Sequence, residues 1–508
     1  MKKNYDSEFC GSLPLSFINQ IQPYGYLVVI DKEQWQVLQV SQNLEGLFNV
    51  EVYDLLEKPV SQFISNEQLS SIQNKVKNST GNHKFPTRLS LQVSGTQKDF
   101  LCMVHPGEEC LLLELELLPE TSESFLTIYQ EIKYAVDSLT HTDSLNELNE
   151  VVLRELKRTS GFDRIMIYKF DEDWNGEVIA EVLEPGMDPY LGLRFPASDI
   201  PKQARELYLK NPYRLIPDQD YTSVKLLPVI NPLTNTFTNL SDCNVRGVAT
   251  VHLEYLKNMN VGASMSTRIL KGDALWGLIS CHHRTAKFLN FEQCSVFEML
   301  SDVISTKLAA INTKEAAAEA TALQTTYTNL LEQVFVTTDI MEGLTTGPVT
   351  LLDVLDCSGA AILYRKGIKT LGDTPSEPQI RSLAFWLQKE VGNGVFVETA
   401  LESVYEEAAT FAGTACGIIV LPLHKEKGEF IIGFRPEVVE TVSWGGNPDE
   451  AINFEPDKKK YHPRNSFKQW QQTLEGTALS WNEQQLQIAE KLRAFVIEFM
   501  LKTTSVTD

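Results

Sequence analysis

The sequence predicts an α+β protein of several domains, in which antiparallel sheets with helices are joined by a long helical spine. Three observations predict this class. At about 150 residues per domain, a chain of 508 residues has room for three or four domains. Short strand-like apolar runs, separated by turns and helical patterns, recur in three regions. The helical pattern from residue 290 to about residue 334 is too long to be buried on both sides within one small domain.

The first region, residues 24–118, predicts an antiparallel sheet with one covered face, because its apolar runs are separated by short breaks. Its last run carries glutamates at alternate positions, so it indicates a strand and not a membrane-spanning segment. The predicted strands are 25–30, 37–40, 89–93, 100–104 and 110–118.

The second region starts with a helical pattern over residues 124–158, in which Ser144 and Glu147 have the spacing of a capping box. Two hairpins follow, and the long stretch 183–250 between them is expected to be irregular. Loops of that length inside a compact domain are commonly functional. The predicted hairpin strands are 164–170, 177–181, 264–270 and 275–282.

A long helix follows, which Asn290 and Gln293 can cap. Apolar residues recur along it every seven positions, which is typical of a partial heptad seam. The alanine-rich stretch 314–323 continues the helix to about Val334. We interpret it as an interdomain spine and a dimer contact, and the alternative is an ordinary packed helix. The seam residues are Phe297, Leu300, Ile304, Leu308 and Ile311.

The third region predicts another α+β domain with strands at 349–354, 359–364 and 417–423. Ser480 and Glu483 have capping-box spacing before a last helix with one apolar face. Because this helix ends near the last residue of the sequence, we expect a further domain to follow it in the complete protein. The apolar residues of the helix are Leu486, Ala489, Leu492, Val496 and Phe499.

Composition argues against several functions and locations. A net charge of −22 argues against non-specific binding of nucleic acid, which needs clustered lysine and arginine. No apolar run approaches the roughly 20 residues that span a bilayer, and residues 1–6 lack the apolar core of a secretory signal. The eight cysteines include no CxxC pair, so a reduced, cytoplasmic setting is expected.

Most of the cysteines are expected to be buried core thiols, since Cys102, Cys110, Cys281 and Cys416 lie in strand-like runs. Cys10 is different, because it stands alone in a polar leader eleven residues before Ile21. A thiol in that position suggests an attachment point.

The sequence motifs give little support to a metal site or to nucleophilic catalysis. His282 and His283 are adjacent on a predicted strand, so their side chains point to opposite faces and cannot share an ion without a bend. No HExxH pattern is present, and no catalytic motif surrounds Cys10 or Cys281. We therefore expect no metal site and no enzymatic activity in this chain.

Several motifs, in their order and spacing, resemble the photosensory module of the bacteriophytochromes over nearly the whole chain. The run Ile21-Gln22-Pro23 resembles the opening of the PAS domain. The Pro-Ala-Ser-Asp-Ile-Pro run at 196–201 and the segment 252–266 resemble the GAF chromophore pocket. The run 444–446, Trp-Gly-Gly, and the run 463–467, Pro-Arg-Asn-Ser-Phe, resemble the tongue of the PHY domain.

The resemblance implies four parts, with a knot between the PAS and GAF domains. These are a leader at 1–20, a PAS domain at 21–120, a GAF domain at 121–310, and a PHY domain at 311–508 whose tongue spans about 430–475. Tyr24 and Asn260 depart from the family pattern, which commonly has histidine and glycine there. Asparagine tolerates the left-handed conformation, so the turn at Asn260 is expected to survive.

The resemblance also implies a covalently bound bilin. Plant-type and many cyanobacterial members attach it through a GAF cysteine just before the histidine that matches His252, but this chain has Val251 there. Bacteriophytochromes use a leader cysteine, which Cys10 matches. The expected cofactor is therefore biliverdin IXα, held by a thioether to Cys10.

The family's pocket roles carry over to matching residues. Arg214 and Arg246 are expected at the propionates, with Ser264 and Ser266 as hydroxyl partners; a surface ion pair is the alternative for either arginine. The backbone carbonyl of Asp199 and the side chain of His252 are expected at the pyrrole nitrogens, and His282 at the ring D carbonyl. Further expected pocket residues, for which plain core packing is the alternative, are Met166, Tyr168, Phe195, Ile200, Pro201, Tyr208, Tyr255 and Met259.

The implied function is a red/far-red photoreceptor that converts between Pr and Pfr states. In the resting family state the Asp199 side chain pairs with Arg464, and after light it meets Ser466, while the tongue changes from hairpin to helix. The other expected tongue residues are Trp444, Gly445, Gly446 and Pro463.

The expected partners are a second copy through the GAF and PHY helices and a downstream output module, a histidine kinase or a response regulator. No nucleic acid and no membrane are expected. Two other hypotheses remain: a GAF module for a cyclic nucleotide or another small ligand, and an enzyme. The Asp-Ile-Pro run and the tongue motifs argue against the first, and the lack of a phosphoacceptor box or a nucleotide-binding glycine-rich segment argues against the second.

Overall fold

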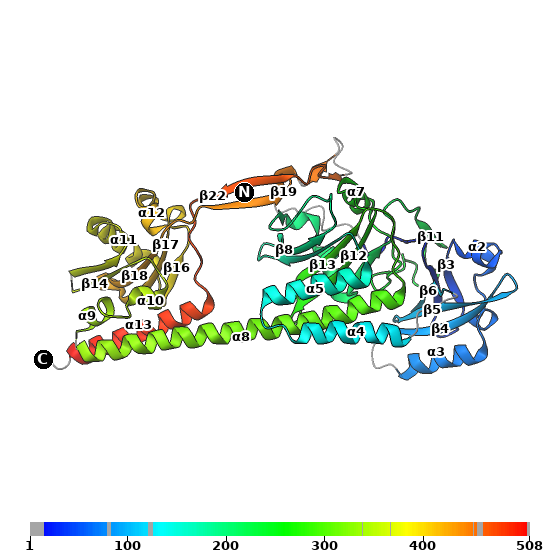
Figure 1. The fold of residues 1–508 in the computed structure, drawn as a ribbon, viewed down its shortest axis with the longest axis horizontal. Helices are drawn as coiled ribbons and strands as arrows, with labels where there is room; N and C mark the ends of the chain where they lie inside the picture. Colours follow the sequence, from blue (N-terminus) through cyan, green and yellow to red (C-terminus); the bar gives the residue numbers. More distant parts are fainter. Residues whose placement is uncertain are drawn as a thin grey trace. The chain divides into compact units, whose positions relative to one another are not determined.

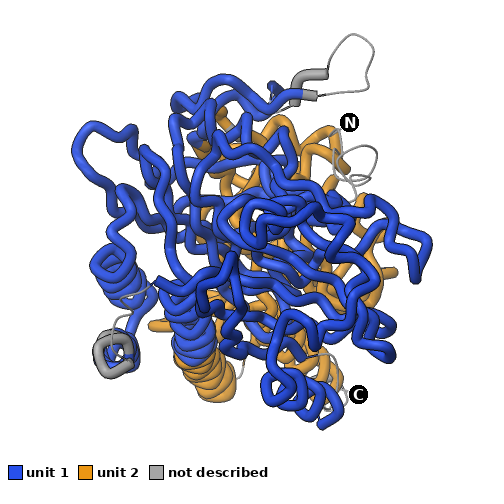
Figure 2. The backbone as a smooth tube through the Cα atoms, turned by 90° about the vertical axis from the view of Figure 1, so that its right-hand side faces the viewer, with its two compact units in different colours: residues 1–311, 443–470 blue, residues 312–442, 471–508 orange. Residues whose placement is uncertain are grey.

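The computed structural model describes residues 15–78, 83–119, 125–337, 339–365, 367–450, 452–454 and 461–504. The chain forms two compact units (Figure 2). Residues 1–311 and 443–470 make the first unit, and residues 312–442 and 471–508 make the second. Among the described residues, no helix is both long and apolar enough to cross a membrane.

The first sheet of unit 1 has seven strands in the order β1-β11-β3-β2-β6-β5-β4, all paired antiparallel. The five predicted strands are confirmed. One face packs on a core with α2, α3 and the short helices η2 and η3, and the other on apolar residues from 224–245. The bounds are β1 Gln20–Ile21, β2 Tyr26–Asp31, β3 Val37–Ser41, β4 Phe85–Val93, β5 Thr96–Pro106, β6 Cys110–Leu117, β11 Val224–Leu227, α2 Leu44–Phe48, η2 Val52–Asp54, η3 Val60–Gln62 and α3 Asn66–Asn78.

The second sheet of unit 1 has the order β10-β12-β13-β7-β8-β9-β19-β22. Alternation along β7 assigns its two faces: Ile165 and Ile167 pack with α4, α5 and α8, whereas Met166 and Tyr168 pack in a separate cluster on the other face (Figure 1). The bounds are β7 Arg164–Phe170, β8 Gly176–Leu183, β9 Arg194–Phe195, β10 Tyr213–Ile216, β12 Ala263–Lys271, β13 Ala274–His283, β19 Glu440–Gly445, β22 Gln469–Leu474, α4 Phe125–Thr140, α5 Leu145–Ser160 and α8 Phe291–Thr337.

The stretch 183–250 is more ordered than expected, and this corrects the prediction of an irregular segment. It contains two sheet strands, β10 and β11, that are only four residues each. A strand of four residues is the shortest in which the alternation of apolar and polar residues can be detected, so the sequence pattern does not reveal these two strands. It also contains β9, the short helix η4 Ala197–Asp199 and the helix α6 Lys202–Lys210, and α7 Thr250–Asn258 begins at its end.

Residues 19–22 lie between two limbs of the 224–247 segment. On one side the Leu226 amide donates to the Asn19 carbonyl at 3.2 Å, and β1 pairs with β11. On the other side the Gln22 amide donates to the Val245 carbonyl, and the Gly247 amide to the Gln20 carbonyl, both at 2.7 Å. These contacts suit the expected knot, whose threading stays a prediction.

The long helix α8 spans 47 residues, and its predicted cap is confirmed. The Asn290 side chain accepts from the Gln293 amide at 2.9 Å, and the Gln293 side chain accepts from the Asn290 amide at 3.1 Å. The seam residues from Phe297 to Ile311 are at most 3% exposed and belong to the core shared with α4 and α5. The seam therefore faces the core of the same chain, and the dimer contact expected of the long helix stays a prediction.

Unit 2 contains a five-stranded antiparallel sheet in the order β15-β14-β18-β17-β16. One face packs on the end of α8 with α9, α10 and α13, and the other on α11 and residues 401–415. The bounds are β14 Gly359–Tyr364, β15 Gly367–Gly372, β16 Phe396–Glu398, β17 Gly417–His424, β18 Glu429–Arg435, α9 Ile340–Thr345, α10 Leu351–Leu355, α11 Glu377–Glu390, α12 Ala412–Ala415 and α13 Glu483–Thr504, with the short helices η5 Leu401–Ser403, η6 Glu406–Thr410 and η7 Lys425–Lys427.

Two predictions in unit 2 are wrong. The predicted strand 349–354 is mostly the helix α10, because Thr350 and Asp353 form a capping box that favours the helix. The last helix is capped by Asn482, whose side chain accepts from the Gln485 amide at 2.9 Å, and not by Ser480. The other predicted features, strands β14 and β17 and the apolar face of α13, are confirmed.

Candidate functional site

A single pocket on the second sheet of unit 1 collects the predicted cofactor residues. Every one of them within the described chain lines it, and Cys10 lies outside the described residues. The pocket is bounded by the sheet, by η4 with α6, and by α7. The predicted residues that line it are Met166, Tyr168, Phe195, Asp199, Ile200, Pro201, Tyr208, Arg214, Arg246, His252, Tyr255, Met259, Ser264, Ser266 and His282.

The sheet pleat explains the polar wall of the pocket. Arg214 on β10, Ser266 on β12 and Ser280 on β13 are register partners across three strands, so they share one face. Ser264 lies two residues from Ser266 on that face and pairs with His282. Tyr208 closes the row, because its hydroxyl lies 2.6 Å from Ser266 Oγ.

The two arginines differ in their partners. Arg214 donates to three backbone carbonyls, those of Asn244 at 3.1 Å, Arg246 at 2.6 Å and Gly247 at 2.9 Å. Arg246 donates one hydrogen bond to the Leu15 carbonyl at 3.3 Å, and its buried Nε has no partner among the described groups. Arg214 thus holds the loop, while Arg246 has a free donor inside the pocket.

Burial destabilises the charge of both arginines, and the charge of Arg214 further destabilises that of Arg246. Burial, and then the nearby charge of Arg214, lower the pKa of Arg246 to about 9. Burial also lowers the pKa of Arg214. Within the described chain neither guanidinium forms an ion pair with a carboxylate. The pocket therefore offers an uncompensated positive region that suits an anionic ligand.

Two histidines in the pocket are held neutral. Burial, and then the charge of Arg214, lower the pKa of His252 to about 4. Burial, followed by Arg164 and His252, lowers the pKa of His282 to about 3. His282 Nε2 lies 3.2 Å from Ser280 Oγ, and its buried Nδ1 has no partner among the described groups. A polar ligand atom could occupy that unused position.

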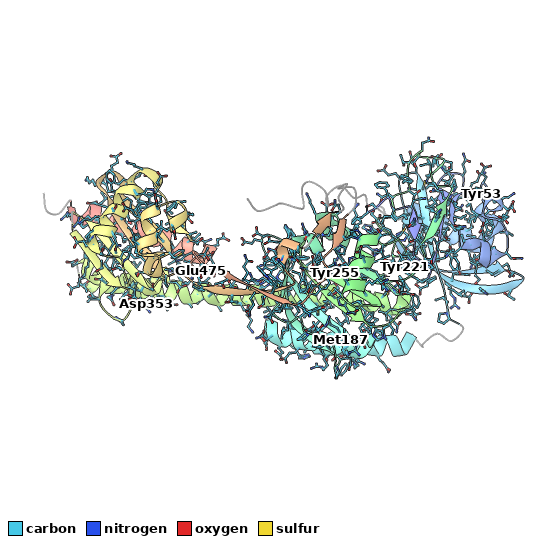
Figure 3. All side chains as sticks on the ribbon, turned by 90° about the horizontal axis from the view of Figure 1, so that it is seen from above. Tyr53, Met187, Tyr221, Tyr255, Asp353 and Glu475 are labelled. Atoms are coloured by element: carbon cyan, nitrogen blue, oxygen red, sulfur yellow. The ribbon has the colours of Figure 1, made fainter. Side chains whose placement is uncertain are left out.

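Aromatic rings from β7, β9 and α7 line further parts of the pocket. The ring centroids of Tyr168 and Phe195 are 6.1 Å apart, and those of Tyr190 and Phe195 are 5.7 Å apart. On α7, His252 stacks on Tyr255 with a centroid distance of 5.9 Å and an interplanar angle of 13°. Tyr255 is labelled in Figure 3 together with Tyr221, whose hydroxyl accepts from the Val248 amide at 2.8 Å. The aromatic rings therefore give the pocket a largely apolar lining beside its polar row.

A buried ion pair lies between Asp199 and Arg464. The side chains are 6% and 3% exposed, respectively, and the Tyr255 hydroxyl also donates to Asp199 at 2.8 Å. Burial raises the pKa of Asp199, and Arg464 and Tyr255 oppose that rise. Pro463 lines the pocket, whereas Ser466 is exposed and does not meet Asp199 in this structure.

The glycines of the Trp-Gly-Gly run are explained by close contacts. A Cβ atom at Gly445 would lie 2.7 Å from the Phe195 ring. Gly446 has a φ of +92°, and a Cβ there would lie 2.2 Å from the Ser466 carbonyl oxygen. Trp444 on β19 is the register partner of Arg194 on β9, so the segment 443–445 extends the second sheet.

Three family models match the chain in the same order as its sheets. The PAS fold matches residues 10–118, the GAF domain residues 144–308, and the phytochrome region residues 323–505. A bacteriophytochrome of Xanthomonas campestris is 32% identical over 511 residues, which cover 97% of this chain and 78% of the relative.

The chain belongs to the phytochrome family.

Other phytochromes are similar over the same extent. Cyanobacterial phytochrome B of a Nostoc species is 33% identical over 499 residues, 98% of this chain and 66% of the relative. The crystal structure of bacteriophytochrome RpBphP3 from R. palustris has a TM-score of 0.85 at 30% identity and covers 97% of this chain and 99% of that chain. The chain thus spans slightly less than two thirds of the first cyanobacterial relatives, at 64% to 66% of their length.

The fold accommodates Asn260 and Tyr24, the two residues that depart from the phytochrome pattern. Asn260 adopts a φ of 56°, so asparagine takes the left-handed conformation expected there. Tyr24 packs on Phe288 with a ring-centroid distance of 5.5 Å.

Several residues around the phytochrome pocket were missed by sequence reasoning. Ser280 could have been found, because it lies two residues before His282 on the same strand face. Tyr190, Leu15 and Ile18 also line the pocket but lie in segments without a regular period. Near Arg464, the Asn258 side chain donates to the Arg464 carbonyl at 3.2 Å, a contact that no local pattern announces.

Proposed function

We propose that this chain is the photosensory part of a red/far-red photoreceptor that binds biliverdin IXα covalently and converts between Pr and Pfr states. The observation that carries the proposal is a pair of buried arginines that have no carboxylate partner within the described chain, at the edge of a largely apolar pocket. A linear tetrapyrrole with two propionates and a long conjugated body has the complementary chemistry.

The residues that would hold the pigment follow from their partners. Arg246 has an unused buried donor for a propionate, and Ser264 and Ser266 add hydroxyl groups on the same sheet face. His252 and the Asp199 carbonyl are available for the pyrrole nitrogens, and His282 offers its unpaired nitrogen to a ring carbonyl. When bound, the pigment supplies a double bond that isomerises on absorbing light.

The attachment residue is Cys10. Leu15, five residues later, already lines the pocket, and a chain of that length reaches at most about 17 Å. Val251 also lines the pocket but has an aliphatic side chain that cannot form a thioether. A leader attachment favours biliverdin over the bilins that are bound through the GAF position.

One experiment tests both the pigment and its attachment. The apoprotein is mixed with biliverdin, and absorption is recorded before and after red light. A zinc-fluorescence gel under denaturing conditions then compares wild type with Cys10→Ser and with the control Cys416→Ser, whose buried thiol lies in unit 2. We expect a reversible red/far-red difference spectrum and loss of gel fluorescence in Cys10→Ser alone. No light-induced change, or retained pigment in Cys10→Ser, would refute the proposal.

The signal would leave through the segment that carries Arg464. After light, Asp199 would exchange Arg464 for Ser466, and the tongue would change from hairpin to helix. The output would be a histidine kinase or another module, with a response regulator as partner. We further propose a cytoplasmic homodimer whose GAF and PHY helices make contact outside the buried seam of α8.

A further inference from the structure

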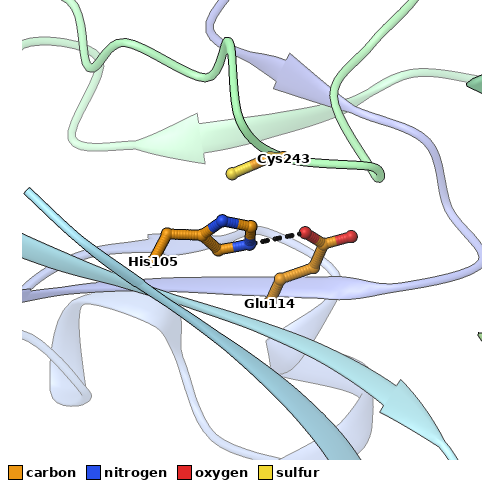
Figure 4. A group of neighbouring side chains, drawn as sticks. All are labelled: His105, Glu114 and Cys243. Carbon is orange, nitrogen blue, oxygen red and sulfur yellow. Dashed lines mark hydrogen bonds and ion pairs between the residues drawn. The ribbon is translucent and has the colours of Figure 1, made fainter. Parts of the chain in front are cut away.

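Three buried side chains with metal-binding atoms meet outside the pigment pocket, on the first sheet of unit 1. His105 on β5, Glu114 on β6 and Cys243 after β11 each offer one ligand atom, and these atoms lie within 4.8 Å of one another. In Figure 4 the Cys243 sulfur lies beside the imidazole ring, whose other edge meets Glu114. Cross-strand register explains the pair, since Leu112 opposes His105 and Glu114 follows on the same face.

The partners of these groups leave ligand positions unused. His105 Nε2 lies 2.9 Å from Glu114 Oε2, while the buried Nδ1 of His105 has no hydrogen-bond partner among the described groups. The side chains of His105 and Glu114 are only 6% and 8% exposed. Cys243 is 0% exposed and free of any disulfide.

We propose that His105, Glu114 and Cys243 bind a zinc ion. Zinc accepts sulfur, nitrogen and oxygen ligands together, and ligand distances of about 2.0–2.3 Å would place the three donors roughly 3.3–3.8 Å apart. The widest separation, at most 4.8 Å, would need to close by about 1 Å, whereas the 2.9 Å between His105 Nε2 and Glu114 Oε2 would need to open slightly. A thiolate and a carboxylate together neutralise the two charges of the ion, which suits a buried site.

Proton balance requires one proton to leave when zinc binds. The Cys243 thiol loses its proton to solvent as the zinc–sulfur bond forms, and an imidazole binds zinc through a nitrogen that carries no proton. Because the thiol must be deprotonated to bind, the affinity for zinc should fall as the pH is lowered.

The site would fasten the loop that holds the leader. Glu114 already accepts the amides of Asn244 at 3.1 Å and Val245 at 3.0 Å. The same loop binds the leader, since the Leu240 amide donates to the Ser16 carbonyl at 2.8 Å. A metal bond from Cys243 to the sheet would add a third fastening between β6 and this loop.

The test measures zinc on the full chain prepared without bilin, because tetrapyrrole nitrogens also bind zinc. The protein is stripped with a chelator, dialysed against zinc sulfate, freed of excess metal by gel filtration and analysed by mass spectrometry for metals. We expect about one zinc per chain in wild type and less than a tenth of that in Cys243→Ala. Cys102→Ala is the matched control, because its equally buried thiol lies on β5 but in the core of the opposite face, and it should keep the wild-type content.

A second variant covers the case in which Cys243→Ala fails to fold. His105→Gln can still donate to Glu114 but lacks the imidazole ligand, so it should fold and lose zinc. In wild type alone, zinc should raise the unfolding temperature by a few degrees, and cobalt should give a sulfur-to-metal charge-transfer band. Wild type that retains less than a tenth of a zinc per chain, or equal retention in wild type, Cys243→Ala and His105→Gln, would overturn the proposal.

Discussion

Two arginines that look equivalent in the sequence have different tasks in the pocket. Arg214 donates to three backbone carbonyls of the 244–247 loop, whereas the buried Nε–H of Arg246 has no partner among the described groups. The donors of Arg214 that hold the loop are therefore separate from the donor that Arg246 has left unused.

Substitution should separate these two tasks. Arg246→Gln should weaken biliverdin binding about 10- to 100-fold, the loss of one charge-assisted hydrogen bond, without lowering the unfolding temperature of the apoprotein. Arg214→Gln should lower that temperature, because buried carbonyls lose their donors. Both variants are measured in a Cys10→Ser background by pigment titration and thermal unfolding. Equal effects of the two on binding and on stability would contradict this division.

The buried histidines predict a pH dependence of stability in the apoprotein. The folded pKa of His282, about 3, lies below its ordinary 6.5, so between these values the unfolded chain binds the proton more readily. The stability is complete above pH 6.5 and is lost as the pH falls towards 3, by about 2 kcal/mol at pH 5. The pKa of His252, about 4, adds a contribution of the same sign.

Denaturant unfolding at pH 7.5 and pH 5 measures this effect. His282→Asn should remove a large part of the difference between the two pH values, while the exposed His141→Gln should leave it unchanged. A wild-type stability that is the same at both pH values would show that His282 is protonated without cost in the folded protein.

At the scale of elements, a buried ion pair holds the segment that follows the short strand β21 (Tyr461–Pro463). Among the described residues, Arg464→Ala would leave the buried Asp199 with the Tyr255 hydroxyl as its one side-chain partner, and breaking such a pair costs about 3–5 kcal/mol. We expect a smaller light-minus-dark difference spectrum. Arg194→Ala, which removes a half-exposed contact with Glu177 at 3.6 Å, is the control and should leave the spectrum unchanged. An unchanged spectrum together with unchanged solution scattering in Arg464→Ala would exclude a role for the pair in photoconversion.

Elements that are long enough to show a hydrophobic period, or that carry a capping motif, could be predicted from the sequence, and short elements could not. The strands of the first sheet and the cap of α8 follow from alternation and from Asn290 with Gln293. The run 349–354 could not be assigned, because an apolar stretch of that length suits a strand or a helix until its cap is recognised.

The residues of a site, too, could be predicted only where they lie in a recognisable sequence motif. Motif residues such as His252 and Ser264 were predicted, since their neighbours carry the family pattern. His105, Glu114 and Cys243 carry no local motif, and only the packing of the 240–247 loop on the first sheet brings them together. Spacing along the chain therefore gave no reason to consider them as one site.

At the scale of the molecule, a substitution in the buried seam of α8 should lower the stability of the core without changing dimerisation. Phe297 is 1% exposed and packs with α4 and α5, so Phe297→Ala should cost about 3–5 kcal/mol of stability. It should lower the unfolding temperature and leave the ratio of monomer to dimer unchanged. Analytical ultracentrifugation and calorimetry measure the two quantities. Dissociation without a loss of stability would show instead that the seam joins two copies.

The placement of residues 19–22 between the limbs of 224–247 constrains the order of events during protein synthesis. The Gln22 side chain donates to the carbonyls of Leu215 and Arg246, residues that leave the ribosome much later. At roughly 5–20 residues per second, the 225 residues from 23 to 247 take about 10 to 45 s to translate. During that time residues 19–22 lack their final partners. Chaperones therefore meet this segment unpaired before they meet a finished pocket.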